Sequence, residues 1–260
     1  VIILVGIGSV SRWREDTISN LSKQLRTPAI LAVVFASVSL LFLPGKMSFT
    51  AWFALLLAFW VINSLFMQLK KRLRHSKNLL QDLKRTPRGW YGMILAHMGL
   101  SFTVIGIALS SVYSQEQDVH MLKGDDRTLG EYRFELVDVE RITGPNYKAD
   151  MGTIRIYKNE KELMTLHPEK RIYNVRKNIM TEASIHSNLL RDLYVSLGEQ
   201  RDINTGAWSV RLYYKPFILW IWLGGFVMVL GGSLALTDKR YRTSLKQEEI
   251  KLDDNNVIAN

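Results

Sequence analysis

Residues 91–112 read "YGMILAHMGLSFTVIGIALSSV", a stretch of apolar and small side chains with a single ionisable group, His97. A helix that crosses the ~30 Å hydrocarbon core of a bilayer needs roughly 20 predominantly apolar residues, and this stretch is long enough. An ionisable group at such a depth is costly, and by default it serves a function or faces a protected interior. The stretch therefore predicts a transmembrane helix in which His97 either serves a function or faces a protected interior.

Three other stretches are long and apolar enough to cross a membrane: "PAILAVVFASVSLLFLP" (28–44), "TAWFALLLAFWVINSLFMQL" (50–69) and "PFILWIWLGGFVMVLGGSLAL" (216–236). The opening "VIILVGIGSV" (1–10) has no basic residue before it and no small-residue cleavage pattern after it, so a signal peptide is a poor interpretation. We expect it to be the truncated end of a transmembrane helix, which makes the chain the C-terminal part of a larger protein.

Charge gives the expected orientation. Residues 69–88 carry eight Lys or Arg and one acidic residue. Basic residues also flank the other apolar stretches, and all these basic segments lie on the same side of the membrane if each stretch crosses it once. The positive-inside rule makes that side cytoplasmic. The expected parts are cytoplasmic loops at 11–27 and 70–90, two transmembrane helices in 28–69, the helix with His97 at 91–112, a domain outside the cytoplasm at 113–215, the last transmembrane helix at 216–236 and a cytoplasmic tail at 237–260.

The net charge of +10 is a signal of topology. Residues 113–215 hold 16 basic and 16 acidic residues, so the whole excess lies in the segments that flank the membrane. A nucleic-acid-binding protein would need a basic face on a soluble domain, and this domain offers none. The absence of cysteine excludes disulfides, thiolate metal sites and thiol catalysis within this chain.

Residues 113–215 are expected to form a small, mostly β domain. The alternation in "YRFELVDVERI" shifts phase between Leu136 and Val137, as a β-bulge would cause. The sequences "GTIRIYKNEKELMTL" and "DLYVSLGEQRDINTGAWSVRLYYKP" each alternate, turn and alternate again, which is typical of hairpins. About six short strands favour a barrel or sandwich, and the absence of a nucleophile constellation or phosphate-binding loop favours a binding or docking module.

The predicted fold class is therefore an α-helical polytopic membrane protein with an inserted small β domain outside the cytoplasm. Four of its five histidines are expected to be solvated or structural. His75 lies among basic residues, and the spacing of His120, His167 and His186 matches no local metal-ligand pattern.

Three interpretations of His97 stay open on the residues alone. The imidazole could hydrogen-bond a neighbouring helix, or relay protons, although relays bring carboxylates and no Asp or Glu lies in the four stretches. It could also be an axial ligand to haem, because neutral imidazole is a standard iron ligand. A haem with two imidazole ligands would need its second histidine from outside this chain, because the other three stretches contain none.

Several phrases resemble one protein family: "GWYGMILAHMGLSFTVIGIALSS", "LHPEKRIY", "MTEASIHSNLLRDLYVSLGE" and "WSVRLYYKPFILWIWLGGFVMVLGGSLALTDKRYR". They are similar to the C-terminal third of CcmF, the haem lyase family of bacterial cytochrome c maturation, and to the related NrfE proteins. The resemblance runs from "VGIGSVSRWRED" to about Arg242 in the order of the family.

The resemblance implies a multi-pass protein of the cell inner membrane with residues 113–215 on the periplasmic side. It implies a lyase that takes haem, its substrate, from the chaperone CcmE and, with CcmH, joins it to the CXXCH thiols of apocytochrome c. The family also holds a structural haem b between two transmembrane histidines, thought to reduce the incoming haem iron. His97 in "ILAHMGL" matches the second of these, which makes it the cofactor-binding residue and the axial ligand of the haem iron.

The tryptophan-rich "WWD" segment of the family, its periplasmic haem-ligating histidines and its first transmembrane histidine are expected upstream of this chain. No catalytic residue is assigned here, and activity is expected only together with the N-terminal part of the same lyase. The alternative is a non-catalytic, membrane-anchored assembly scaffold without haem. A transporter fragment is disfavoured, because no stretch has the paired interruption or the charged midplane residue expected of one.

Overall fold

The computed structural model describes residues 1–10, 18–43, 45, 47–74, 81–83, 86–175, 177–200 and 206–238. The chain divides into two compact units, one of Val1–Ala108 with Trp220–Asn260 and one of Leu109–Leu219. Residues 11–17 of the expected 11–27 loop, His75, most of the "INTGA" turn and nearly all of the expected tail lie outside the described residues.

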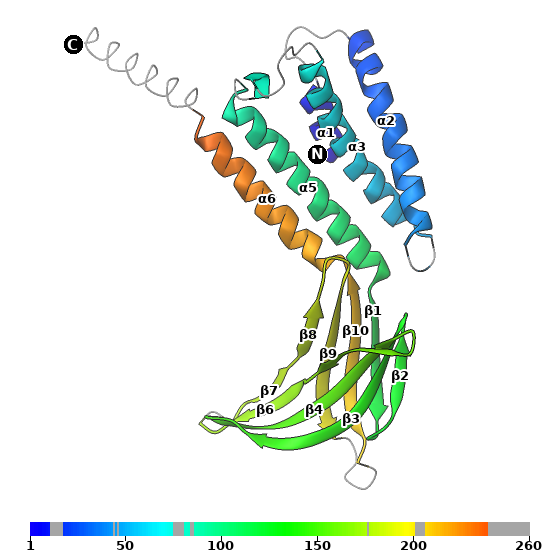
Figure 1. The fold of residues 1–260 in the computed structure, drawn as a ribbon, viewed down its shortest axis with the longest axis vertical. Coiled ribbons are helices and arrows are strands. Elements are labelled where there is room, and N and C mark those ends of the chain that lie inside the picture. The colour runs from blue at the N-terminus through cyan, green and yellow to red at the C-terminus, as the bar shows by residue number, and fades with distance from the viewer. Residues whose placement is uncertain are drawn as a thin grey trace, which may run out of the picture. The chain divides into compact units, whose positions relative to one another are not determined.

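The first unit is helical. Its helices are α1 (Ile2–Val10), α2 (Ile18–Leu41), α3 (Phe49–Leu73), α5 (Arg88–Tyr113) and α6 (Ile218–Leu236) (Figure 1). Within the described residues, α2, α3, α5 and α6 are the four helices that are long and apolar enough to cross a membrane. Helix α2 begins at Ile18 and so includes residues 18–27, which the sequence assigns to a loop, because "NLSKQL" is rich in residues that favour helix.

Helix α3 packs against α1 and α2. The indole Nε1 of Trp60 donates to the carbonyl of Ile3 in α1 at 3.2 Å, and Nε1 of Trp52 donates to Oγ of Ser37 in α2 at 3.1 Å. Each indole N–H therefore has an acceptor on a neighbouring helix, as a donor away from water requires. These bonds tie three helices together along the length of α3.

Helix α5 packs against α6 through glycines that face each other. A Cβ placed on Gly99 would lie 2.5 Å from the carbonyl oxygen of Gly224, and one on Gly92 would lie 2.5 Å from that of Gly231. Only a residue without a side chain allows such an approach, which is a common way for helices to pack in membranes. The backbone N–H of Gly89, in the first turn of α5, also donates to Oδ2 of Asp238 at 2.8 Å, just beyond the end of α6.

The second unit is a β-sandwich. Its strands are β1 (Gln115–Met121), β2 (Asp126–Leu129), β3 (Tyr132–Thr143), β4 (Tyr147–Lys158), β5 (Lys161–Leu166), β6 (Glu169–Tyr173), β7 (Ile179–Glu182), β8 (Ser184–Ser187), β9 (Arg191–Gln200) and β10 (Trp208–Pro216) (Figure 1). One sheet has the order β1-β10-β9-β8. The other has the order β2-β3-β4-β6-β7, with β5 paired to β4. The chain passes from one sheet to the other between β7 and β8. A membrane-type helical part with an inserted β domain confirms the expected fold class.

The core of the sandwich lies between the two sheets, where alternate residues of each strand point inward. Phe134, Ile154, Leu193 and Leu212 are 0% exposed. The predicted bulge is confirmed by the register shift between Leu136 and Asp138. The hairpin predicted from "GTIRIYKNEKELMTL" is β4–β5, and both residues of its two-residue turn have positive φ, as the tight hairpin turns that match strand twist require.

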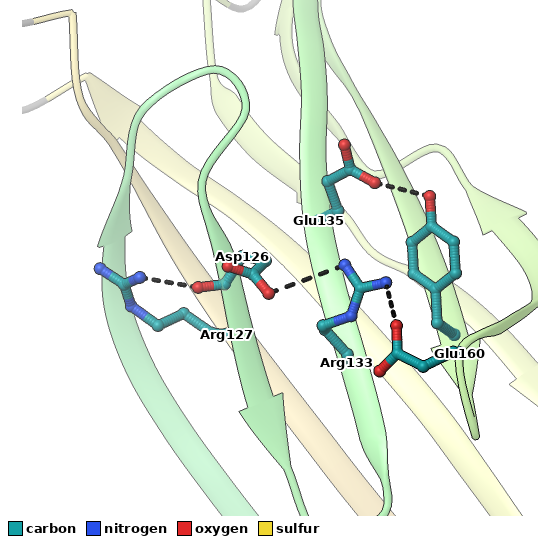
Figure 2. A network of polar contacts seen from close by, with 6 residues as sticks. Asp126, Arg127, Arg133, Glu135 and Glu160 are labelled. Carbon is teal, nitrogen blue, oxygen red and sulfur yellow. Dashed lines mark hydrogen bonds and ion pairs between the residues drawn. The ribbon is translucent and has the colours of Figure 1, made fainter.

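The outward faces of the strands carry paired charges. Figure 2 shows Arg133 of β3 between Asp126 of β2 and Glu160 of the β4–β5 turn, at 3.7 Å and 3.3 Å. The Tyr157 hydroxyl donates to Oε2 of Glu135 at 2.6 Å, and this bond raises the pKa of the tyrosine. These groups leave the inner face of the sheet to apolar side chains.

Candidate functional site

His97 lies in α5, ten residues into the helix, and its side chain is half-buried. Its Nδ1 atom is buried, and no described residue lies close enough to hydrogen-bond it. Buried polar atoms are nearly always paired with protein or water, so an unpaired ring nitrogen needs an explanation. A neutral imidazole keeps a lone pair on one nitrogen, and that lone pair can bind a metal.

Helix α6 does not face His97. The residues of α5 that contact α6 recur at 92, 96, 99 and 103, which form one stripe along the helix. At about 100° per residue, His97 lies roughly 130° around the helix from the centre of this stripe. Whatever meets the imidazole must therefore approach from another side of α5.

Two further polar side chains of the helical unit are buried without a hydrogen-bond partner among the described residues. Asn63 is 6% exposed and Ser64 is 0% exposed, and both lie in α3. Nδ2 of Asn63 and Oγ of Ser64 have no hydrogen-bond partner among the described residues. Ser101, by contrast, is satisfied within its own helix, because its hydroxyl donates to the carbonyl of His97 at 3.0 Å. Asn63 and Ser64 were not predicted as site residues, although two neighbouring polar residues inside the apolar stretch "AFWVINSLFMQL" were the available signal.

The described residues could supply one ligand to a metal-containing group, but they do not form a complete metal site. They hold no cluster of three or more His, Asp or Glu side chains that could bind a metal ion. The imidazole of His97 is suited to one axial position of a haem iron, because its buried nitrogen is not engaged by the protein. The remaining ligands would have to come from outside the described residues.

The other histidines belong to the β unit or lie outside the described residues. His120 and His167 are exposed, on β1 and just after β5, and His75 is not described. His186 on β8 has a specific partner, because its Nδ1 lies 3.0 Å from Nη1 of Arg191. Within the described part of the chain, His120, His167 and His186 do not form a metal site with one another.

Arg191 forms a buried cluster that was not predicted from the sequence. The side chain is 5% exposed and shares the inward face of β9 with Leu193. Its Nε donates to the hydroxyl of Tyr132 at 2.9 Å, and its guanidinium carbon lies 4.8 Å from the centre of that ring. The available signal was the position of the arginine, two residues before the first leucine of "LYVSL". Alternate residues of a strand point to the same face, so this position faces the core.

Comparison with known proteins places the chain among cytochrome c biogenesis proteins. A family described as "CcmF C-terminal beta-sandwich" matches residues 112–216. The chain is 41% identical to the cytochrome c-type biogenesis protein CcmF of Pseudomonas aeruginosa, over 93% of this chain and 36% of that protein. It is 39% identical to CcmF of Escherichia coli K12, over 95% of this chain and 37% of that protein. The chain thus spans little more than a third of these relatives.

A solved structure shares the fold. The structure titled "Cytochrome c Heme Lyase CcmF" superposes with a TM-score of 0.70 at 19% identity, and the match covers 91% of this chain and 38% of that one. At this level of identity the likeness concerns the fold alone. It supports an arrangement of membrane-type helices with an inserted β-sandwich.

Proposed function

Because the chain belongs to the CcmF family of cytochrome c-type biogenesis proteins, as its C-terminal part, we propose that it forms the C-terminal portion of a cytochrome c haem lyase. The whole lyase would take haem from the chaperone CcmE and, with CcmH, attach it to the CXXCH thiols of apocytochrome c. This portion would supply one axial ligand of a haem b, the periplasmic β domain and the last transmembrane helices. The N-terminal part of the same lyase would supply the rest.

The observation that carries the proposal is the state of His97. The residue lies within an apolar helix of a multi-pass membrane protein, and its Nδ1 is buried without a partner among the described residues. A buried imidazole in a membrane is expensive to maintain without a function. A bound haem would supply an iron that accepts and donates one electron, and His97 would hold that iron from one side.

The role of α5 would be to fix the imidazole. Gly92 and Gly99 lock one face of the helix against α6, which leaves His97 on a different face with little freedom to rotate away. A rigid ligand helix would keep the distance between His97 and the iron constant, and the identity and surroundings of an axial ligand set the potential of a haem. The basic end of α3, with Lys70, Lys71 and Arg72 in its last turn, supports the orientation with the β domain on the periplasmic side.

The test is a reduced-minus-oxidised absorbance spectrum of this chain purified together with the N-terminal part of its lyase. We expect a b-type signal that is lost in His97→Ala and regained when imidazole is added. The matched control is His120→Ala, which removes an exposed histidine of the β unit and should leave the signal unchanged.

Two outcomes would contradict the proposal. A signal that survives His97→Ala would assign the iron to other residues. A folded complex without any haem signal would favour the assembly scaffold, in which His97 serves only as a buried polar group.

A further inference from the structure

The turn between β8 and β9 exposes two neighbouring leucines. Leu189 is 62% exposed and Leu190 is 61% exposed. The tight turn between β4 and β5, by contrast, carries the polar residues Asn159 and Glu160. The two leucines therefore give the β8–β9 turn an apolar tip at residues 189–190.

The tip is held rigidly by its neighbours. Oδ1 of Asn188 accepts hydrogen bonds from the backbone N–H groups of Leu190 and Arg191, both at 2.9 Å, and the N–H of Asn188 donates to the carbonyl of Arg191 at 3.0 Å. The side chain of Arg191 is in turn fixed in the core by Tyr132 and His186. A preorganised tip loses little conformational entropy when its side chains are covered.

The tip is bonded to the start of a membrane-type helix. The N–H of Phe217 donates to the carbonyl of Leu190 at 3.0 Å, and α6 begins at the next residue, Ile218. Phe217 alone links β10 to α6, with a positive φ of 57° that turns the chain sharply. Leu190 therefore lies at the level where the chain leaves the sandwich and enters the helix.

The length of α6 places that level at the edge of the hydrocarbon. The helix has 19 residues, and at about 1.5 Å per residue it is roughly 28 Å long. A hydrocarbon core of ~30 Å needs all of this length, so Ile218 must lie at its boundary. Lys215, which is exposed three residues earlier, marks the polar side of that boundary.

We propose that Leu189 and Leu190 insert into the lipid bilayer at the boundary between headgroups and acyl chains, beside the first turn of α6. Apolar side chains that border a membrane bind it by burying their surface about 5–10 Å into this boundary. Lipid is the expected contact because of where the turn lies. Leu190 is bonded to Phe217, and the next residue begins a helix whose surface spans the membrane. The insertion gives the β unit a second attachment to the bilayer, besides its two connections to α5 and α6.

The absence of cysteine in this chain makes the test direct. Spin labels are attached to Leu189→Cys and Leu190→Cys in the complete lyase, whose other part is made free of cysteine, in phospholipid vesicles. Collisions with oxygen, which concentrates in lipid, are compared with collisions with a water-soluble nickel chelate. The matched control is Leu163→Cys, a leucine of β5 that is 46% exposed.

We expect labels at 189 and 190 to collide more often with oxygen than with the nickel chelate, and the label at 163 to show the reverse. More frequent collisions with the chelate at 189 would put the tip in water and overturn the proposal. Rare collisions with both reagents would show that another protein surface covers the tip, and would overturn it equally.

Discussion

The two units of this chain place their large apolar side chains in opposite ways. In the β-sandwich, Phe134 is 0% exposed and lies between two sheets. In helix α6, Phe226 is 61% exposed and Trp222 is 73% exposed. The same residue types are hidden in one unit and displayed in the other, because the sandwich is built for water and the helix for hydrocarbon.

The polar side chains differ in the same sense. The sandwich pairs its charges on its outward faces and satisfies even its buried Arg191 with Tyr132 and His186. The helical unit buries His97 and Asn63 with atoms that have no partner among the described residues. The difference is one of degree, because Oε1 of Gln117 and Oδ1 of Asp192 in the sandwich also lack a partner among the described residues, and of all these groups only His97 is a ligand in the proposed function.

The largest expected effect tests the apolar half of this comparison. Phe134→Ala removes a ring from the closed core of the sandwich and should lower the free energy of unfolding by about 3–5 kcal/mol. The matched change Phe226→Ala removes a ring from the exposed side of α6 and should cost far less, because lipid replaces it. Thermal unfolding of both variants in lipid nanodiscs measures the difference. Equal losses would show that Phe226 is covered by protein.

The second prediction concerns how the helical unit is held together. Gly224→Leu forces a side chain into the backbone of α5, since a Cβ at this position would lie 2.5 Å from the carbonyl oxygen of Gly99. Such overpacking should destabilise the pair of helices by about 1–3 kcal/mol. Gly225→Leu is the matched control, because a Cβ there has nothing within 4 Å.

The measurement is the unfolding temperature of the complete lyase in detergent. A loss at Gly225 as large as that at Gly224 would mean that leucine disturbs the helix itself, and that the contact with α5 is not the cause.

The helices and the inward faces of the strands could be predicted from the sequence, because their signals are local. Runs of apolar residues mark α3, α5 and α6, and alternation marks β9 and β10. The shift of phase after Leu136 even located the bulge. The early start of α2 was missed because its first turns are polar, and polarity alone cannot distinguish a helix end from a loop.

The candidate site was predicted only in part, because its remaining features depend on residues far apart in the sequence. His97 was apparent from its apolar surroundings, and its unpaired Nδ1 agrees with the ligand proposal without testing it. The contact between Arg191 and Tyr132 joins residues 59 positions apart, and no local pattern announces it. The order of strands across the two sheets likewise follows from long-range pairing.

The third prediction tests whether the sandwich depends on satisfying its buried cation. Tyr132→Phe keeps the ring but removes the hydroxyl that accepts from Nε of Arg191. The loss should fall at the lower end of about 1–3 kcal/mol, because Arg191 keeps its contact with His186. Tyr157→Phe, which removes an outward hydroxyl bonded to Glu135, should cost less. Chemical denaturation of the complete chain compares the two, and an equal cost would remove the special role of Arg191.

The smallest expected effect lies in an ion pair that joins the two sheets of the sandwich, between β6 and β9. Nζ of Lys170 donates to Oε1 of Glu199 at 2.8 Å and holds the pKa of this carboxyl below its ordinary value of 4.5. A pKa that is lower in the folded state makes the ion pair stabilising above pH 4.5, and this contribution is lost as the pH falls through the folded-state pKa.

Glu199→Gln should therefore lower the unfolding temperature slightly at pH 7 and leave it unchanged at a pH well below the folded-state pKa of Glu199, with a smaller difference in high salt. The effect stays small because the side chain of Glu199 is 77% exposed, so water screens the attraction. A loss at pH 7 comparable with that of Phe134→Ala would mean that a solvent-exposed ion pair stabilises the sandwich as strongly as its core. The stability of the sandwich would then depend on surface electrostatics as much as on its buried apolar side chains. The difference between the two units could no longer be explained by the placement of apolar side chains alone.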